Sequence, residues 1–155
     1  MYPTLESRAD ILRMMDEIRE ARKKILERCD RLSAAKLSDS VYPGTWSVLK
    51  NLTHLAWAEE WMLGWIRKRP GVLSPEERPA EPPAELPAVR TALDESHAAA
   101  IAFLKANSEA VLKERCLYSR QNEQTVGGVF FHLIEHEIHH RAFILNKLAK
   151  LESGQ

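Results

Sequence analysis

The sequence predicts an all-α protein, a four-helix bundle, from three observations. Helical spacing of apolar residues recurs over four stretches, at about residues 5–32, 47–69, 88–106 and 125–151. No stretch makes a convincing strand. A proline-rich segment, Pro70–Pro87, separates the first two helices from the last two. A helix pair, a long crossover and a second pair are typical of a bundle with one long connection.

The first predicted helix carries a single apolar stripe. Its members recur at spacings of three, four or seven: Ile11, Met15, Ile18, Ile25, Cys29 and Leu32. The basic residues Arg19, Arg22, Lys23 and Lys24 lie largely outside this stripe. Turn residues between Ser33 and Gly44 then predict a connection to the second helix.

Residues that cap or stop helices set the other boundaries. Ser47 and Thr125 are suited to accept a hydrogen bond from an early helical N–H, so each is a predicted N-cap. Pro70 and Gly71 stop the second helix. The segment Pro70–Pro87 holds six of the eight prolines, and we expect it to cross the surface in extended form, as a long traverse or a lid. Residues 111–124 form a polar stretch of no predicted type.

Length and charge narrow the functional classes. A chain of 155 residues is expected to form one domain, spanning residues 1–155. Lys plus Arg equals Asp plus Glu at 22 each, so no overall field attracts nucleic acid or an anionic membrane. The two cysteines, Cys29 and Cys116, form no C-x-x-C pair and are expected to serve packing in a reducing compartment. Without a secretory or membrane-spanning segment, we expect a soluble cytoplasmic protein.

The residues most indicative of chemistry lie near the C-terminus, where residues 132–140 hold four of the six histidines. On a helix, His132, His136 and His140 follow one another at steps of about 40°, and His139 lies at the edge of the same stripe. Imidazoles one turn apart can converge on one cation. This clustering predicts a metal site, and the alternative is a hydrogen-bonded histidine cluster without metal.

A histidine on another helix completes the predicted site. His54 lies in an otherwise apolar stripe of the second helix, close to Asn51 and Trp61 on the helical wheel. Alone, such a histidine is more often a satisfied core residue. Together with His136 and His140 across the bundle core, it predicts a three-histidine site.

The segment from His136 to His140 also matches H-E-x-x-H, in which the glutamate of a zincin protease is the general base. Here that residue is Glu137. A zincin needs a third ligand, commonly well downstream, and only fifteen residues follow His140. Glu137 lies about 100° from His136 on the wheel, so a solvated or ion-paired role competes with a catalytic one. Proteolysis is therefore a minor alternative.

Two further patterns concern neighbours of the site. The last helix is apolar on the side opposite its histidines as well, which predicts that a second subunit, or the crossover, covers that side. A homodimer is the simpler choice. Trp57, Trp61 and Trp65 repeat every four positions, a pattern typical of a core or interface. The alternative is a functional role, in which Trp61 forms an aromatic wall beside a bound substrate.

Two sequence blocks, Gly44–Leu55 and Phe131–Arg141, in this order and separated by a long crossover, resemble the DinB-like superfamily, which includes YfiT-like metalloenzymes. The resemblance implies an up-up-down-down four-helix bundle, often dimeric, with one divalent metal bound by three histidines, here His54, His136 and His140. His132 and His139 would be neighbours. Relatives include transferases that use low-molecular-weight thiols. The second block usually ends His-Arg-Gly-Gln, whereas this chain has Ala142 and Phe143 in the last two places, which alters substrate handling but not the ligands.

The resulting hypothesis is a metal-dependent enzyme that acts on a small molecule, as a thiol S-transferase or a hydrolase. Imidazole ligands suit zinc, nickel, iron and copper, so the metal is not identified. Glu59, Glu60, Glu135 and Glu137 are candidates to orient the histidines, and the sequence does not choose among them. The alternatives are a non-catalytic dimeric metal-binding or stress-response module and a metal-free bundle.

Overall fold

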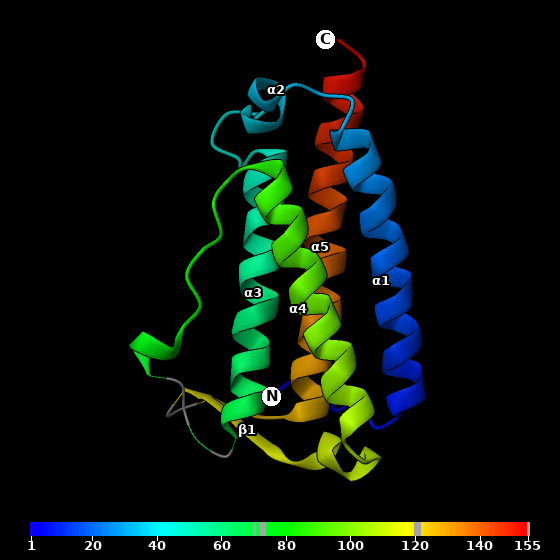
Figure 1. The fold of residues 1–155 in the computed structure, drawn as a ribbon, viewed down its shortest axis with the longest axis vertical. Helices are drawn as coiled ribbons and strands as arrows, with labels where there is room; N and C mark the ends of the chain where they lie inside the picture. The colour runs from blue at the N-terminus through cyan, green and yellow to red at the C-terminus, as the bar shows by residue number, and fades with distance from the viewer. Residues whose placement is uncertain (70, 72–73, 120–121, 155) are drawn as a thin grey trace.

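Four long helices lie side by side in the computed structural model, which describes residues 1–69, 71, 74–119 and 122–154 (Figure 1). They are α1 (Arg8–Cys29), α3 (Val48–Lys68), α4 (Leu86–Ala106) and α5 (Val126–Glu152). A short helix, α2 (Ala34–Ser38), lies between the first two. The four-helix bundle predicted from the sequence is therefore confirmed.

Capping side chains fix the starts of three long helices. The hydroxyl oxygens of Ser7, Ser47 and Thr125 accept hydrogen bonds from backbone N–H groups three residues onward. Such bonds satisfy donors that the first helical turn leaves unpaired. The predicted N-caps Ser47 and Thr125 are confirmed. Helix α4 begins instead with a proline at its N-terminal turn, where the missing N–H costs no hydrogen bond.

The helices run up, down, down and up, so the expected up-up-down-down order was wrong (Figure 1). The connection after α1, residues 30–47, stays at the end of the bundle where α1 ends, so α3 runs antiparallel to α1. These two helices lie diagonally opposite each other, and each packs on α4 and α5. The crossover after α3 returns to the far end, which lets α4 run parallel to α3. Ion pairs support these directions. Arg28 near the end of α1 meets Glu152 at the end of α5, and Arg90 near the start of α4 meets Asp30.

The crossover follows one side of the bundle, as expected for a traverse. It contains a short 3₁₀ helix, η1 (Pro75–Glu77), and is fastened to α3 where Trp57 Nε1 donates to the carbonyl of Pro79 at 2.9 Å. Lys50 and Glu81 form an exposed ion pair at the same side. Pro70, where the crossover was expected to begin, lies outside the described residues.

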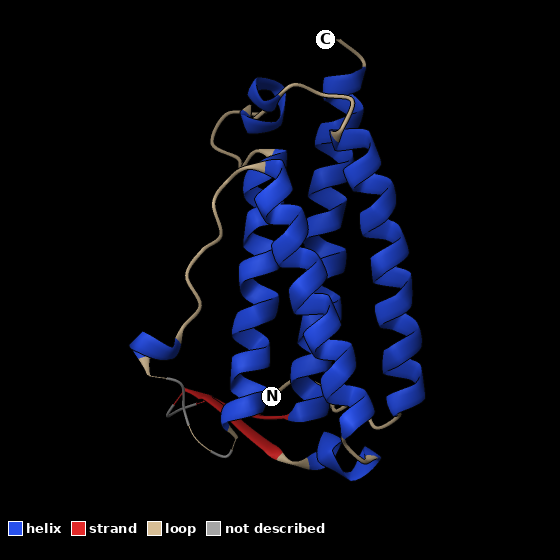
Figure 2. Ribbon diagram, viewed as in Figure 1, coloured by secondary structure: helices blue, strands red, loops and turns tan. Residues whose placement is uncertain are grey.

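The absence of a convincing strand was a wrong expectation. After a second 3₁₀ helix, η2 (Glu109–Lys113), strands β1 (Arg115–Ser119) and β2 (Asn122–Thr125) form an antiparallel hairpin. Figure 2 shows it at the end of the bundle where α3 ends and α5 begins. The strands are short and largely polar, so their apolar alternation is too weak to detect in the sequence.

The core between the helices is mostly apolar. Cys29 and Cys116 are fully buried, and burial raises the pKa of these thiols to about 11 and about 12, which fits the predicted packing role. Arg22 was expected to lie largely outside the apolar stripe, yet it is only 6% exposed.

In the part of the chain that the structure describes, no helix is both long enough and apolar enough to span a bilayer.

Candidate metal centre

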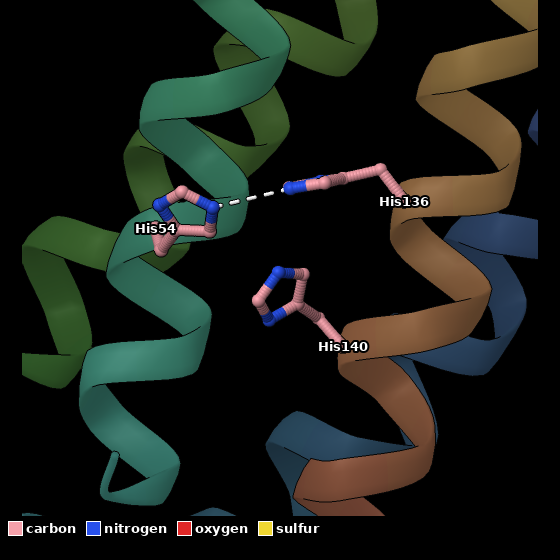
Figure 3. A group of neighbouring side chains, drawn as sticks. All are labelled: His54, His136 and His140. Atoms are coloured by element: carbon pink, nitrogen blue, oxygen red, sulfur yellow. Dashed lines mark hydrogen bonds between the residues drawn. The ribbon is translucent and has the colours of Figure 1, made fainter. Parts of the chain in front are cut away.

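Three histidines from two helices meet inside the bundle. His54 lies in the middle of α3, and His136 and His140 lie one turn apart on α5 (Figure 3). One nitrogen of each ring lies within 4.8 Å of the other two. Nε2 of His54 and Nε2 of His136 are 3.1 Å apart. We call these three residues the histidine triad. The structure thus brings together the three residues that the sequence predicted as a group.

An asparagine fixes the proton on one ring of the triad. Asn51 Nδ2 donates to the carbonyl oxygen of Ser47 at 2.8 Å, which identifies the other amide atom as the oxygen. That oxygen, Oδ1, lies 2.9 Å from Nδ1 of His140. Because Oδ1 only accepts, Nδ1 carries the proton and Nε2 of His140 keeps a free lone pair. Asn51 was a predicted neighbour, and this contact gives it a physical role.

The surroundings keep the triad neutral. Burial, followed by the neighbouring imidazoles, lowers the pKa of His136 to about 3 and that of His140 to about 4. Burial and then Lys50 lower the pKa of His54. At neutral pH all three rings are therefore uncharged, which is the form of histidine that binds metal ions.

The donor set fits a divalent cation. Two nitrogens bound to a tetrahedral zinc at about 2.0–2.1 Å are themselves about 3.3 Å apart, close to the 3.1 Å between His54 and His136. Without a cation, one of these facing nitrogens must carry a proton, because two lone pairs repel each other. The group found among the described residues has three members, fewer than the four protein ligands of a structural zinc site.

The other two predicted histidines lie beside the triad. The ring of His132 is 5.7 Å from that of His136 and stacks on Tyr2 at 4.3 Å. Its Nδ1 lies 3.5 Å from a carboxylate oxygen of Glu135. His139 is exposed, and its ring meets that of His140 edge-on at 5.4 Å. Both are neighbours rather than members of the group.

Tryptophans form walls around the triad. Trp46 stacks on His140 with 14° between the rings and meets His54 edge-on at 5.0 Å. Trp57 lies 5.7 Å from His54. Trp61, the predicted wall residue, lies against Trp57 one turn further along α3 with 35° between the rings, and it is not among the residues that line the cavity beside the triad. Trp46 was not singled out from the sequence, because it precedes α3 in a loop whose path no helical wheel describes.

Glu137 points away from the histidines. Its Oε2 accepts from Arg22 Nη2 at 2.9 Å, and the same Nη2 donates to Glu59 Oε2 at 2.6 Å. Both carboxylates are at most 2% exposed. A zincin base must reach a water at the metal, whereas this carboxylate is buried against α1, so the geometry opposes the protease interpretation. We call Arg22, Glu59 and Glu137 the buried ionic cluster.

None of the other glutamates that the sequence offered as partners of the histidines forms an ion pair with a member of the triad among the described residues. Glu60 pairs with Arg67 at the surface, and Glu135 is exposed beside His132. Glu59 and Glu137 therefore act on the triad through the helices that carry them, by tying α3 and α5 to α1. The spacing of a single helix cannot reveal this cluster, because its three members lie on three different helices.

A cavity of about 610 Å³ opens beside the triad. His140 and Asn51 line it near the triad, and Ala142 and Phe143 line it further along α5. These two residues replace the Gly-Gln of the sequence block described above, so the departure from that pattern lies in the cavity wall. The volume is within the range of small-molecule pockets.

Comparisons with known proteins agree with this architecture. A family model described as the DinB superfamily matches residues 17–144. A crystal structure of a DinB-like protein from Bacillus cereus superposes with a TM-score of 0.71 at 19% identity, covering 97% of this chain and 94% of that one. The four-helix bundle protein TT2238 superposes with a TM-score of 0.64 at 20% identity, covering 90% and 99%. No curated protein matches the sequence.

Proposed function

The chain belongs to the DinB superfamily, and from this premise we propose that it is a divalent-metal-dependent enzyme whose cation is held by His54, His136 and His140. When bound, a cation held by three neutral imidazoles keeps its charge and an open position, so it acts as a Lewis acid and lowers the pKa of a water or thiol. The proposed reaction is the transfer of a low-molecular-weight thiol to an electrophile, or the corresponding hydrolysis with water.

One observation supports this proposal: a member of the triad, His140, lines a cavity large enough for a substrate. A purely structural metal would be closed off by protein ligands on all sides. Here His140 both belongs to the triad and lines the cavity. This arrangement favours an enzyme over the non-catalytic metal-binding module.

The protein groups have separate roles in the proposed mechanism. Asn51 holds the proton on Nδ1 of His140, so that Nε2 remains a ligand. The stacked ring of Trp46 covers one face of His140 and limits the access of water. The buried ionic cluster holds α1, α3 and α5 in register, so that His54 stays opposite His136.

The test is turnover of a panel of small thiols with an electrophilic aryl halide or epoxide, and of ester substrates without thiol. We expect turnover that a chelator abolishes and that added zinc, nickel or iron(II) restores. The His54→Ala variant should be inactive at every metal concentration. Metal-loaded protein without chelator-sensitive turnover across the panel would favour the binding module instead.

A further inference from the structure

Residues of α5 from His140 to Lys147 line the cavity beside the triad. At one end it is lined by His140 and Asn51, and at the other by Thr45 and Lys147. His140 and Lys147 are seven residues apart on one helix, which corresponds to about 10.5 Å along its axis. The cavity therefore offers two chemically different ends about two helical turns apart.

The walls between these ends are apolar and aromatic. Trp46, Tyr42 and Phe143 line the cavity and are 45%, 39% and 49% exposed. Ala142 adds a small apolar side chain to the α5 wall. Large aromatic side chains around a concave site are typical of pockets that cover the apolar body of a ligand.

The far end carries a buried positive charge. Lys147 is only 3% exposed, and its Nζ donates to the carbonyl oxygen of Ser40 at 2.7 Å and to Thr45 Oγ1 at 2.5 Å. Nζ also lies 5.1 Å from the centroid of the Tyr42 ring. All these partners are uncharged. Burial lowers the pKa of Lys147, while Asp39 opposes the shift.

A buried ammonium is normally paired with an anion. In the ranges 1–69, 71, 74–119 and 122–154, no carboxylate oxygen lies within 4.0 Å of Lys147 Nζ, the distance limit for an ion pair. An ammonium has three N–H donors, and two of them are used by Ser40 and Thr45. A carboxylate in the cavity would supply the missing counter-charge.

We propose that the cavity binds an elongated substrate with an apolar, aromatic-compatible body and a carboxylate that binds Lys147, so that its reacting group lies at the histidine triad. This inference rests on the proposed function for the position of the reacting group. Along the helix axis, the residues at the two ends are about 10 Å apart, which corresponds to roughly nine bonds of an extended chain.

The anion end can be tested without metal. In the presence of a chelator, the affinities of 6-phenylhexanoate and of its neutral analogue 6-phenylhexanamide are measured by calorimetry. We expect the wild type to bind the carboxylate at least tenfold more tightly, and Lys147→Met to lose this preference. Lys150→Met, on the same helix but outside the cavity, should keep it. Equal affinities in the wild type, or an unchanged preference in Lys147→Met, would overturn the inference.

Lys147 also holds the loop through its hydrogen bonds to Ser40 and Thr45. Lys147→Met therefore removes loop contacts as well as a charge, and a second variant tests the charge with Lys147 in place. Asn146 lines the same cavity and is exposed. Asn146→Asp adds a negative charge beside the proposed carboxylate, and it should weaken binding of 6-phenylhexanoate several-fold without changing that of the amide. Equal effects on both probes would also count against the anion site.

A second experiment separates this inference from the proposed function. With zinc-loaded protein, acetohydroxamate probes the metal alone, and suberic acid monohydroxamate adds a carboxylate about 10 Å away. We expect at least a tenfold gain for the longer probe and none for succinic acid monohydroxamate. No gain, with acetohydroxamate still bound, overturns the inference and leaves the metal site standing. If acetohydroxamate does not bind while 6-phenylhexanoate is preferred over its amide, the metal role is wrong and the anion end stands.

Discussion

Asn51 Oδ1 accepts a hydrogen bond from Nδ1 of His140 at 2.9 Å, and this contact decides which nitrogen of His140 is available as a ligand. Both residues are buried, so water does not readily replace the contact. In Figure 3 the other nitrogen of the His140 ring is turned toward His54 and His136. The orientation of the triad thus depends on a residue one turn before His54 on α3.

The first prediction concerns this contact. Asn51→Ala removes the acceptor, so His140 can take the wrong tautomer, and zinc affinity should fall by about 10- to 100-fold. Competition with a chromogenic chelator measures the loss. Asn146→Ala, an amide on the rim of the cavity, is the matched control and should bind zinc like the wild type. An Asn51→Ala protein that is folded and has wild-type affinity would show that the contact does not orient the ligand.

The second prediction concerns the buried ionic cluster. Arg22→Met leaves Glu59 and Glu137 buried without their cation, so the free energy of unfolding should fall by about 3–5 kcal/mol. Urea denaturation measures it. Arg28→Met breaks the far more exposed pair with Glu152 and should cost less than about 1 kcal/mol.

Replacing all three members of the cluster by apolar residues is its internal control. Arg22→Met combined with Glu59→Leu and Glu137→Leu removes every buried charge of the cluster and should restore much of the lost stability. If the triple variant is no more stable than Arg22→Met, loss of packing rather than an unpaired charge explains the single variant.

The third prediction concerns pH. His97 is 6% exposed, and burial, followed by Arg22, lowers its pKa from 6.5 to about 4. The folded protein then binds fewer protons than the unfolded chain between these values, so stability is lost as the pH falls from about 6.5 to about 4.

Urea midpoints measured across this range in chelator-treated protein test the effect. His97→Gln should reduce the dependence of the unfolding free energy on pH, by at most about 1.4 kcal/mol per pH unit for one group. The histidines of the triad contribute in the same direction, so a residual slope is expected in the variant. Identical slopes for both proteins would show that His97 titrates normally in the fold.

The fourth prediction concerns assembly, and homodimerisation stays a prediction. Ile138 and Leu145 lie seven residues apart on α5 and are 52% and 39% exposed. A second copy that packs on this face would cover them. Ile138→Asp combined with Leu145→Asp should convert a dimer to a monomer in light scattering, whereas Lys24→Asp on α1 should not. A wild type that is monomeric at high concentration would exclude this face as an interface.

Sequence patterns predicted the parts of the site that repeat within one helix. The four-residue spacing places His136 and His140 on one face of α5, and the polar residue His54 in an apolar stripe marked the facing helix. The capping residues Ser47 and Thr125 likewise predicted helix starts, because a cap acts on its own first turn.

Features that depend on several elements were not predictable in this way. Arg22 lies in the middle of the apolar stripe of α1, four residues after Ile18 and three before Ile25, so the wheel itself indicates its burial. Its partners Glu59 and Glu137 lie on other helices, and the pattern of α1 cannot identify them. Trp46 reaches His140 from a loop, so its place depends on the path of the chain before α3. The order of helix directions depends on how far each connection travels, which length and composition alone do not determine.

The most direct test of the account is the metal stoichiometry of tag-free protein, measured by zinc titration of chelator-treated wild type and of its His54→Ala and His136→Ala variants. The account predicts one zinc per chain in the wild type and an affinity at least a hundredfold lower in each variant. Stoichiometry far below one, or binding unchanged by both substitutions, would contradict a three-histidine metal centre.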